Sequence, residues 1–150
     1  MNIFTILRNN SGGPKYFDLR LMELGMAVIL VADDDDILVE LARFRLEHDG
    51  HTVITVSDGQ AAVQSARKYL PDIVILDAMM PGLNGLEVLY ILKNDEELSA
   101  IPVLMLTARK GEADIIGAVK SGASDYMTKP FAPQELSARV DVLLARAGYV

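Results

Sequence analysis

The sequence predicts a doubly wound α/β fold in which helices cover both faces of a five-stranded parallel sheet. Short apolar runs alternate with segments of helical periodicity five times after residue 26. The central runs, such as IVIL at 73–76, carry no polar side chain, which indicates strands buried on both faces. With 150 residues and 51% hydrophobic content, the chain suffices for one well-filled core.

The first strand is expected at residues 28–32. The helix that follows begins near Ile37 and ends at Asp49-Gly50, since glycine commonly terminates helices. Helical numbering divides this segment into an apolar stripe and a polar side. We expect the apolar stripe to face the core; it consists of Ile37, Leu38, Leu41, Ala42 and Phe44.

The second strand is expected at residues 52–56. Ser57-Asp58-Gly59 then provides an N-cap for a helix that runs to about Tyr69 and ends at Leu70-Pro71. The third strand follows at residues 73–77 and ends in Asp77, directly before a Met-Pro-Gly turn signal.

The second half of the chain repeats the alternation. We expect a helix at about 84–93, a strand at 102–106, a helix at about 112–120 and a strand at 124–127. Pro133 suits the first turn of a last helix, which ends near Arg146. Leu136, Val140 and Leu143 share one face of that helix and are expected to pack on the core.

Residues 1–25 differ from the rest of the chain. Residues 9–14 read NNSGGP, a linker-like composition, and residues 16–24 (YFDLRLMEL) suit either a short amphipathic helix or a strand. We interpret 1–25 as an N-terminal extension or linker, with an interaction arm as the alternative. Residues 26–150 are expected to form a single domain.

Composition narrows the function classes. The net charge of −7 and the sequence pI near 4.7 disfavour direct binding to nucleic acid or to anionic membranes. The chain has no cysteine, which excludes disulfides and thiolate chemistry. Because no apolar run could span a bilayer and the N-terminus lacks the pattern of a secretion signal, we expect a cytoplasmic protein.

Acidic side chains follow two strands that we expect to be neighbours. Asp33 and Asp34 come directly after the first strand, and Asp77 ends the third. Carboxylates brought together at one sheet edge repel one another unless a hard cation such as Mg²⁺ takes oxygen ligands from them. Asp35 and Asp36 extend the acidic run, and one of them is expected to cap the following helix.

A hydroxyl and an ammonium stand at two further strand ends. Thr107 follows the fourth strand, and Lys129 follows the fifth, just before Pro130. A lysine before proline is held in extended or turn geometry, and a cis peptide is possible there. Either residue alone is weak evidence of a site. Together with the three aspartates, they place acids, a hydroxyl and an ammonium at four strand ends of one sheet.

From about Met26 to Gly148 the chain resembles a response-regulator receiver domain of two-component signalling. The resemblance rests on Asp33-Asp34, on LDAMMPGLNG around Asp77, on LTA at 106–108, and on YMTKPF at 126–131. Thr107 follows Asp77 by 30 residues and Lys129 follows Thr107 by 22, as in the family. The resemblance implies a flavodoxin-like (βα)5 three-layer sandwich with the parallel sheet order 2-1-3-4-5.

The resemblance also implies the chemistry. Asp77 would accept a phosphoryl group from a sensor histidine kinase or from a small phosphodonor. Mg²⁺, or Mn²⁺, would be held by Asp34, Asp77 and the backbone carbonyl of Met79, with Asp33 acting through water. Thr107 and Lys129 would contact phosphoryl oxygens. Such a protein is a signalling phosphoacceptor with self-phosphorylation and autodephosphorylation chemistry rather than an enzyme.

Output in this family is conformational. The resemblance implies that phosphorylation would draw Thr107 inward and that an aromatic residue, here Tyr126, would change rotamer. The face of the fourth helix, fifth strand and fifth helix would then bind a downstream effector or form a homodimer. Asp125, Glu135 and Arg139 match part of the charge set that dimerises in the winged-helix subfamily, although an ordinary pair within one helix also explains Glu135 and Arg139.

Three alternatives remain open at this stage. A haloacid-type aspartyl-phosphate hydrolase needs a second carboxylate two residues after the nucleophile, where this chain has Met79. A flavin mononucleotide binder needs a phosphate loop rich in serine, threonine or glycine after the first strand, where this chain has four aspartates. A phosphate-independent interaction module is the third. His48 and His51 are interpreted as ordinary residues of a turn far from Asp77.

Overall fold

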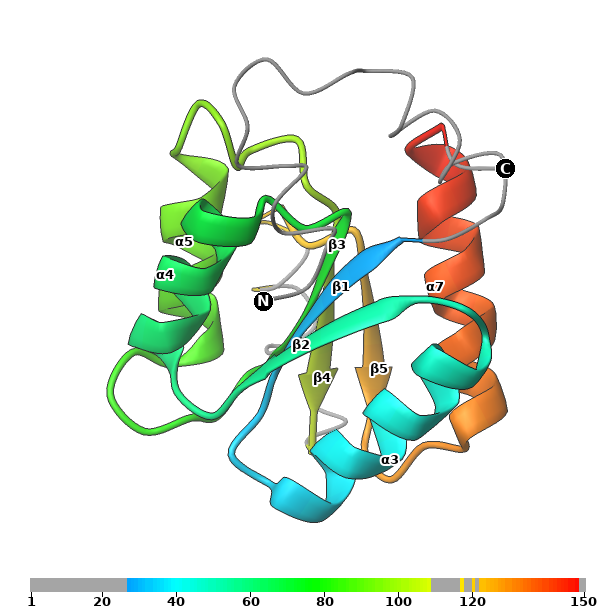
Figure 1. Cartoon of the computed structure of the whole chain (residues 1–150). Helices are drawn as coiled ribbons and strands as arrows, with labels where there is room; N and C mark the ends of the chain where they lie inside the picture. Colours follow the sequence, from blue (N-terminus) through cyan, green and yellow to red (C-terminus); the bar gives the residue numbers. More distant parts are fainter. Residues whose placement is uncertain (1–26, 109–116, 118–119, 121, 149–150) are drawn as a thin grey trace.

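The computed structural model describes residues 27–108, 117, 120 and 122–148. Its centre is a parallel sheet in the order β2-β1-β3-β4-β5, which confirms the predicted fold class (Figure 1). Every strand starts and ends within one residue of its predicted bounds. The strands are β1 (Val28–Ala32), β2 (Thr52–Val56), β3 (Ile73–Asp77), β4 (Val103–Thr107) and β5 (Asp125–Thr128).

Four helices lie within the described residues: α3 (Asp36–His48), α4 (Gly59–Tyr69), α5 (Gly85–Lys93) and α7 (Pro133–Arg146). Side chains satisfy the free backbone N–H groups at the start of three of them. Asp35 caps α3, Asp58 caps α4, and Asn84 forms a reciprocal capping box with Glu87 on α5. The helix expected at 112–120 falls almost entirely outside the described residues, as do residues 1–26.

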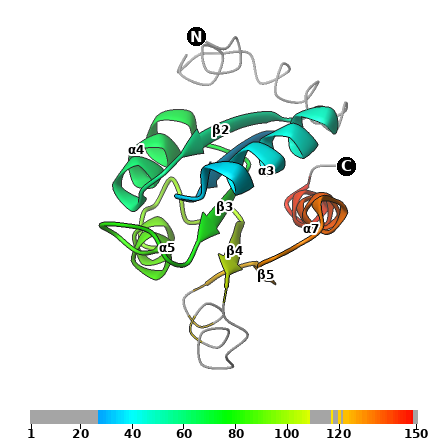
Figure 2. The same ribbon diagram turned by 90° about the horizontal axis from the view of Figure 1, so that it is seen from below.

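Helices cover both faces of the sheet, as Figure 2 shows from below. The alternation of side chains along each strand divides the core in two. Ile29 and Val31 of β1 pack with α3 and α7, whereas Leu30 and Ala32 pack with α4 and α5. Within the described ranges, no helix is both long and apolar enough to cross a bilayer.

The predicted apolar stripe of α3 is wrong for three of its five residues. Ile37, Leu41 and Phe44 are 76%, 56% and 75% exposed. The residues of α3 that enter the core are Val39, Ala42 and Leu46, a face rotated away from the predicted stripe. Both faces of α3 carry large apolar side chains, so periodicity alone could not identify the one that packs on the sheet.

The parallel register brings the functional strand ends together. Ala32 of β1 pairs with Leu76 of β3, so the next residue of each strand, Asp33 and Asp77, reaches the same edge. In the other half of the sheet, Thr107 pairs with Thr128, directly before Lys129. This carboxyl edge is where open α/β sheets bind ligands.

Candidate functional site: an acidic pocket at the carboxyl edge of the sheet

Backbone hydrogen bonds fix the two buried aspartates of the site. Asp33 is 1% exposed, and its N–H donates to the carbonyl of Val56, 3.1 Å away. Asp77 is 4% exposed, and the N–H of the next residue, Ala78, donates to the carbonyl of Leu106 at 2.8 Å. The sheet thus extends one residue beyond each strand and holds both carboxylates in place.

Three carboxylates converge at this edge. Asp33, Asp34 and Asp77 each offer an oxygen atom, and these three oxygens lie within 4.8 Å of one another. Asp33 and Asp77 are buried, whereas Asp34 is exposed. Carboxylate oxygens are the ligands that hard divalent cations prefer, and an exposed member leaves a route from solvent. The donor set therefore fits the predicted cation.

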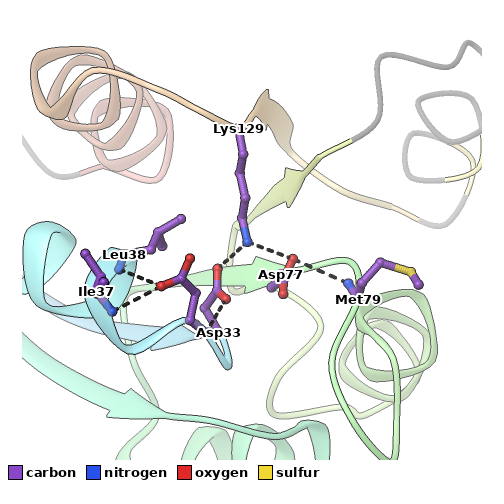
Figure 3. A network of polar contacts seen from close by, with 7 residues as sticks. Asp33, Ile37, Leu38, Asp77, Met79 and Lys129 are labelled. Carbon is purple, nitrogen blue, oxygen red and sulfur yellow. Dashed lines mark hydrogen bonds and ion pairs between the residues drawn. The ribbon is translucent and has the colours of Figure 1, made fainter.

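Lys129 lies between the two buried carboxylates (Figure 3). Its Nζ is 2.7 Å from Oδ2 of Asp33 and 3.2 Å from Oδ1 of Asp77. The backbone N–H of Lys129 donates to the carbonyl of Thr107 at 2.8 Å, and the Lys129–Pro130 peptide is cis, as the sequence allowed. The lysine predicted to bind phosphate is thus within contact distance of the predicted acceptor.

Burial and charge shift the ionisation of the pocket. Burial and, after it, the charge of Asp33 raise the pKa of Asp77, whereas Lys129 and the N–H of Met79 lower it; together they bring this pKa to about 6. Burial alone would lower the pKa of the Lys129 ammonium, but its contacts with Asp33 and Asp77 raise that pKa above the ordinary value. The pocket therefore keeps Lys129 protonated and disfavours the ionised form of Asp77. Additional positive charge in the pocket, such as a bound cation, would favour ionised Asp77 again.

The loop between β3 and α5 packs tightly under Asp77. A Cβ atom on Gly85 would lie 2.2 Å from the backbone oxygen of Asp77, so only glycine fits there. The N–H of Met79 lies 3.4 Å from Oδ1 of Asp77, a long contact, and the Met79 side chain is exposed. Met79 is thus adjacent to the pocket, and the role of its carbonyl as a metal ligand stays a prediction.

Thr107 and Tyr126 lie on the same face of neighbouring strands. Thr107 is buried at the end of β4, and Tyr126 of β5 pairs with Met105 of β4. Met105 precedes Thr107 by two residues, so both point to the same face of the sheet as Tyr126. Tyr126 is partly buried against the core that contains α4 and α5. This arrangement accords with the predicted switch roles but does not test them.

The predicted interface residues contact one another within the chain. Nη1 of Arg139 is 3.0 Å from Oδ2 of Asp125, and Nη2 is 3.2 Å from Oε1 of Glu135. The pair of Glu135 and Arg139 within α7 is thus present, and a second acid from β5 joins it. A role of this cluster between two protein copies remains a prediction.

The comparison with known families decides the assignment. Residues 29–141 match the family described as "Response regulator receiver domain". The chain belongs to this family. Its members are the receiver domains of two-component systems, in which phosphorylation of an aspartate is the general function.

Curated relatives of this receiver domain are transcriptional regulators. The alkaline phosphatase synthesis transcriptional regulatory protein PhoP of Bacillus subtilis (strain 168) is 44% identical over 119 residues, which are 79% of this chain and 49% of PhoP. The DNA-binding response regulator MtrA of Mycolicibacterium smegmatis is 42% identical over 118 residues, 79% of this chain and 50% of MtrA. The receiver domain spans about half the length of these relatives.

The names of these relatives bear on one expectation. The acidic charge of the chain led us to expect no direct binding to nucleic acid, but MtrA is named as a DNA-binding protein. Because a relative of this kind is named as DNA-binding, the expectation that the protein binds no nucleic acid directly is doubtful.

Solved structures support the same family. A putative response regulator from Chloroflexus aurantiacus J-10-fl superposes with a TM-score of 0.77 at 37% identity, covering 80% of this chain and 98% of that one. The chemotaxis response regulator CheY4 of Vibrio cholerae gives 0.75 at 28% identity, covering 79% and 98%.

Sequence reasoning missed two features of the receiver domain. Lys129 lies closer to Asp33 than to Asp77, a pairing for which sequence spacing gives no signal. The structure also has a hollow of about 230 Å³ beside Asp35, between α3 and the Pro130-Phe131 segment. In the sequence, the only signal of this hollow was the apolar residue Phe131 directly after Lys129-Pro130. Arg109, which the family resemblance implies to lie beside the phosphoryl group, is outside the described residues.

Proposed function

We propose that this receiver domain accepts a phosphoryl group on Asp77, and that residues 26–150 constitute the domain that does so. The observation that carries the proposal is the contact of Lys129 with Asp77 inside a cluster of three carboxylates. A buried carboxylate beside a fixed ammonium suits a reaction in which an anionic group is transferred, because such transfers depend mainly on positioning and charge neutralisation.

The transfer needs an exposed donor and a positioned acceptor. An oxygen of Asp77 forms a bond to phosphorus while the bond from phosphorus to the donor breaks, and the donor group leaves with the electron pair. The donor is a phosphohistidine of a sensor histidine kinase or a small acyl phosphate. Lys129 would pair with one phosphoryl oxygen, and the hydroxyl of Thr107 would donate to another.

The donor set fits Mg²⁺, or Mn²⁺, held by Asp34, Asp77 and the Met79 carbonyl, with Asp33 acting through water. When bound, the cation would neutralise negative charge on the carboxylates and on the phosphoryl oxygens. The contacts of Asp33 support an indirect role: Oδ1 accepts the N–H of Asp35 at 2.9 Å, and Oδ2 is paired with Lys129.

Phosphorylation would change the conformation of the face that includes β5 and α7. Thr107 would move toward the phosphoryl group, and Tyr126 would follow into the space it leaves. The face that includes β5 and α7, with Asp125, Glu135 and Arg139, would then bind an effector or a second copy. We place this activity in the cytoplasm, and we regard the protein as a signalling phosphoacceptor that also self-phosphorylates and loses its phosphoryl group.

Intact-mass measurement tests the proposal. The chain is incubated with Mg²⁺ and acetyl phosphate, and it should gain one phosphoryl group that hydroxylamine removes. The adduct should be absent in Asp77→Asn and should persist in Asp36→Asn, which changes an exposed aspartate outside the cluster. Failure of both acetyl phosphate and a panel of histidine kinases to form the adduct would overturn the proposal. Continuous release of phosphate from unrelated monoesters would instead favour a hydrolase.

A further inference from the structure

The turn between β2 and α4 touches both halves of the acidic pocket. Val56, the last residue of β2, accepts the backbone N–H of Asp33 at 3.1 Å and so holds the aspartate that follows β1. Three residues later, Gly59 begins α4 and is buried. Gly59 packs against Leu83, which belongs to the loop that follows Asp77. One short turn therefore connects the backbone that holds Asp33 with the loop beside the proposed phosphoacceptor.

The contact between Gly59 and Leu83 leaves no room for a side chain at position 59. A Cβ atom on Gly59 would lie 2.6 Å from Cβ of Leu83, 2.8 Å from its carbonyl carbon and closer still to its carbonyl oxygen. Non-bonded carbon atoms pack at about 3.5–4.0 Å. Alanine ordinarily favours a helix over glycine, so the close approach, rather than helix propensity, requires glycine at the start of α4.

Leu83 is linked to the acceptor through Gly85, two residues later. The N–H of Gly85 donates to the carbonyl of Ala78 at 3.0 Å. A Cβ atom on Gly85 would lie 2.7 Å from Cα of Ala78 and 2.9 Å from the carbonyl carbon of Asp77. Backbone therefore packs on backbone at two successive places, Gly59 on Leu83 and Gly85 on Asp77. A displacement of Leu83 would be passed on to the residues at the end of β3.

The backbone of Met79 is fixed on both sides. The preceding residue, Ala78, donates its N–H to the carbonyl of Leu106 at 2.8 Å. The following residue, Met80, is 7% exposed and lies in the core against which Leu83 also packs. A carbonyl that is to bind a cation has to be held within about 0.5 Å of the productive position. The loop has the packing that this precision requires.

We propose that Gly59 is a positioning residue for the acceptor loop, residues 78–84. Because Gly59 has no side chain, α4 approaches Leu83 closely and holds the loop where the Met79 carbonyl can bind a hard divalent cation. Gly59 itself touches neither the cation nor the phosphoryl group and acts through Leu83. The proposal rests on the proposed function, in which the Met79 carbonyl is one of the cation ligands.

Calorimetric titration of the full chain with Mg²⁺ tests the proposal. Gly59→Ala should weaken Mg²⁺ binding about tenfold, as substitutions behind a metal ligand commonly do. The titration is made where urea unfolding shows each variant to be folded, so a loss of stability alone would not change the affinity. Gly50→Ala is the control. It places alanine at a φ of +96° with no atom within 4 Å, in the turn before β2 at the opposite edge of the sheet. It should destabilise the fold and leave Mg²⁺ binding unchanged.

Leu83→Gly breaks the same contact from the side of the loop, and it carries the test if Gly59→Ala does not fold. It should also weaken Mg²⁺ binding, because the loop loses its packing on α4 and on the core. Leu86→Gly makes the same chemical change on α5 at an exposed residue and should leave the affinity unchanged. In the double variant, Gly59→Ala should cost less affinity than it does alone, because the Cβ of Leu83 is gone and glycine lets the carbonyl turn away.

Weaker binding in Gly59→Ala and Leu83→Gly, with both controls unchanged, supports the proposal. If the unmodified chain binds Mg²⁺ and Gly59→Ala binds it equally well, the proposal is overturned, and the proposed phosphoacceptor is not. Equal losses in the variants and their controls would overturn it too, since stability would then govern the affinity. Independent losses in the double variant would show that Gly59 does not act through Leu83. Absence of Mg²⁺ binding by the unmodified chain would overturn the proposed cation site and this proposal together.

Discussion

Nζ of Lys129 lies 2.7 Å from Oδ2 of Asp33, closer than its 3.2 Å contact with Asp77. The lysine predicted as a phosphate ligand thus also neutralises a buried carboxylate. In Lys129→Met, the pKa of Asp77 should rise further above about 6, because the positive charge that opposes burial and Asp33 is gone. Carboxyl-carbon NMR titration without metal measures this.

The matched control for that titration is Lys68→Met. Lys68 is exposed on α4 and stacks over the ring of Tyr69, away from the carboxylate cluster. The Lys68→Met substitution should therefore leave the pKa of Asp77 unchanged from that of the unmodified chain. An unchanged or lowered pKa of Asp77 in Lys129→Met would show that the lysine does not neutralise the pocket.

Asp77→Asn should stabilise the metal-free protein at pH 8. Ionised Asp77 has a folded pKa of about 6 against an ordinary value of 3.8, so its ionisation destabilises the fold as pH rises through that window. Replacing the charge should raise the free energy of unfolding by about 1–3 kcal/mol at pH 8, with little effect at pH 4. Urea unfolding at both pH values measures it, and Asp36→Asn should change stability by less than about 0.5 kcal/mol. If Asp77→Asn were less stable than the unmodified chain at pH 8, ionised Asp77 would not be destabilising the fold.

Mg²⁺ should raise the unfolding midpoint, and chelation should reverse the effect. Binding to the folded state alone stabilises by about 1.4 kcal/mol when the free metal is tenfold above its dissociation constant. Asp34→Ala should weaken this response strongly, because Asp34 is the exposed member of the carboxylate cluster. Thermal unfolding with and without Mg²⁺ provides the measurement. An identical response in Asp34→Ala would remove Asp34 from the proposed ligand set.

Much of the fold followed from the sequence because parallel strands leave a strong signal. The strand at 73–77 is apolar on both faces, and its acidic end marks the edge of the sheet. The Ser57-Asp58-Gly59 signal located the start of α4, where Asp58 is the N-cap in the structure. The convergence of Asp33, Asp34 and Asp77 followed from strand order, which the family resemblance implied.

The error on α3 has a physical cause. A helix with one apolar stripe shows which face it buries, but α3 carries Val39, Ala42 and Leu46 on one side and Ile37, Leu41 and Phe44 on the other. Choosing between them requires knowledge of how the helix is rotated against the sheet. The pairing of Lys129 with Asp33 was equally hidden, because it depends on side-chain reach between β1 and β5 rather than on spacing in the sequence.

Gly85→Ala should destabilise the protein although alanine usually favours helices. The added Cβ would lie 2.2 Å from the backbone oxygen of Asp77 and 2.7 Å from Cα of Ala78, so the loop under the acceptor has to shift. We expect a loss of about 2–4 kcal/mol, as for an overpacked core. Gly82→Ala is the comparison: its φ of +72° costs about 1 kcal/mol, but nothing lies within 4 Å. Urea unfolding ranks the two, and a milder effect at Gly85 would contradict the close approach.

His51 should make stability depend on pH. It is 7% exposed, and its Nδ1 accepts the N–H of Ala27 at 3.1 Å, so the folded state requires the neutral imidazole. Burial lowers the pKa of His51 below 6.5, although Asp141, Asp49 and Asp72 oppose the shift. The unfolded chain therefore binds the proton first as pH falls below 6.5, and stability should decrease until the folded-state pKa is passed.

His51→Asn isolates this contribution, because the amide oxygen of asparagine can still accept from Ala27 but does not titrate. The free energy of unfolding should fall less between pH 8 and pH 5 in this variant than in the unmodified chain. Asp77 changes stability in the opposite direction over part of this range, but it does so in both proteins and cancels in the difference. His48→Asn, an exposed change at the last residue of α3, should retain the full slope. Equal slopes in His51→Asn and the unmodified chain would show that the buried imidazole does not set the pH dependence.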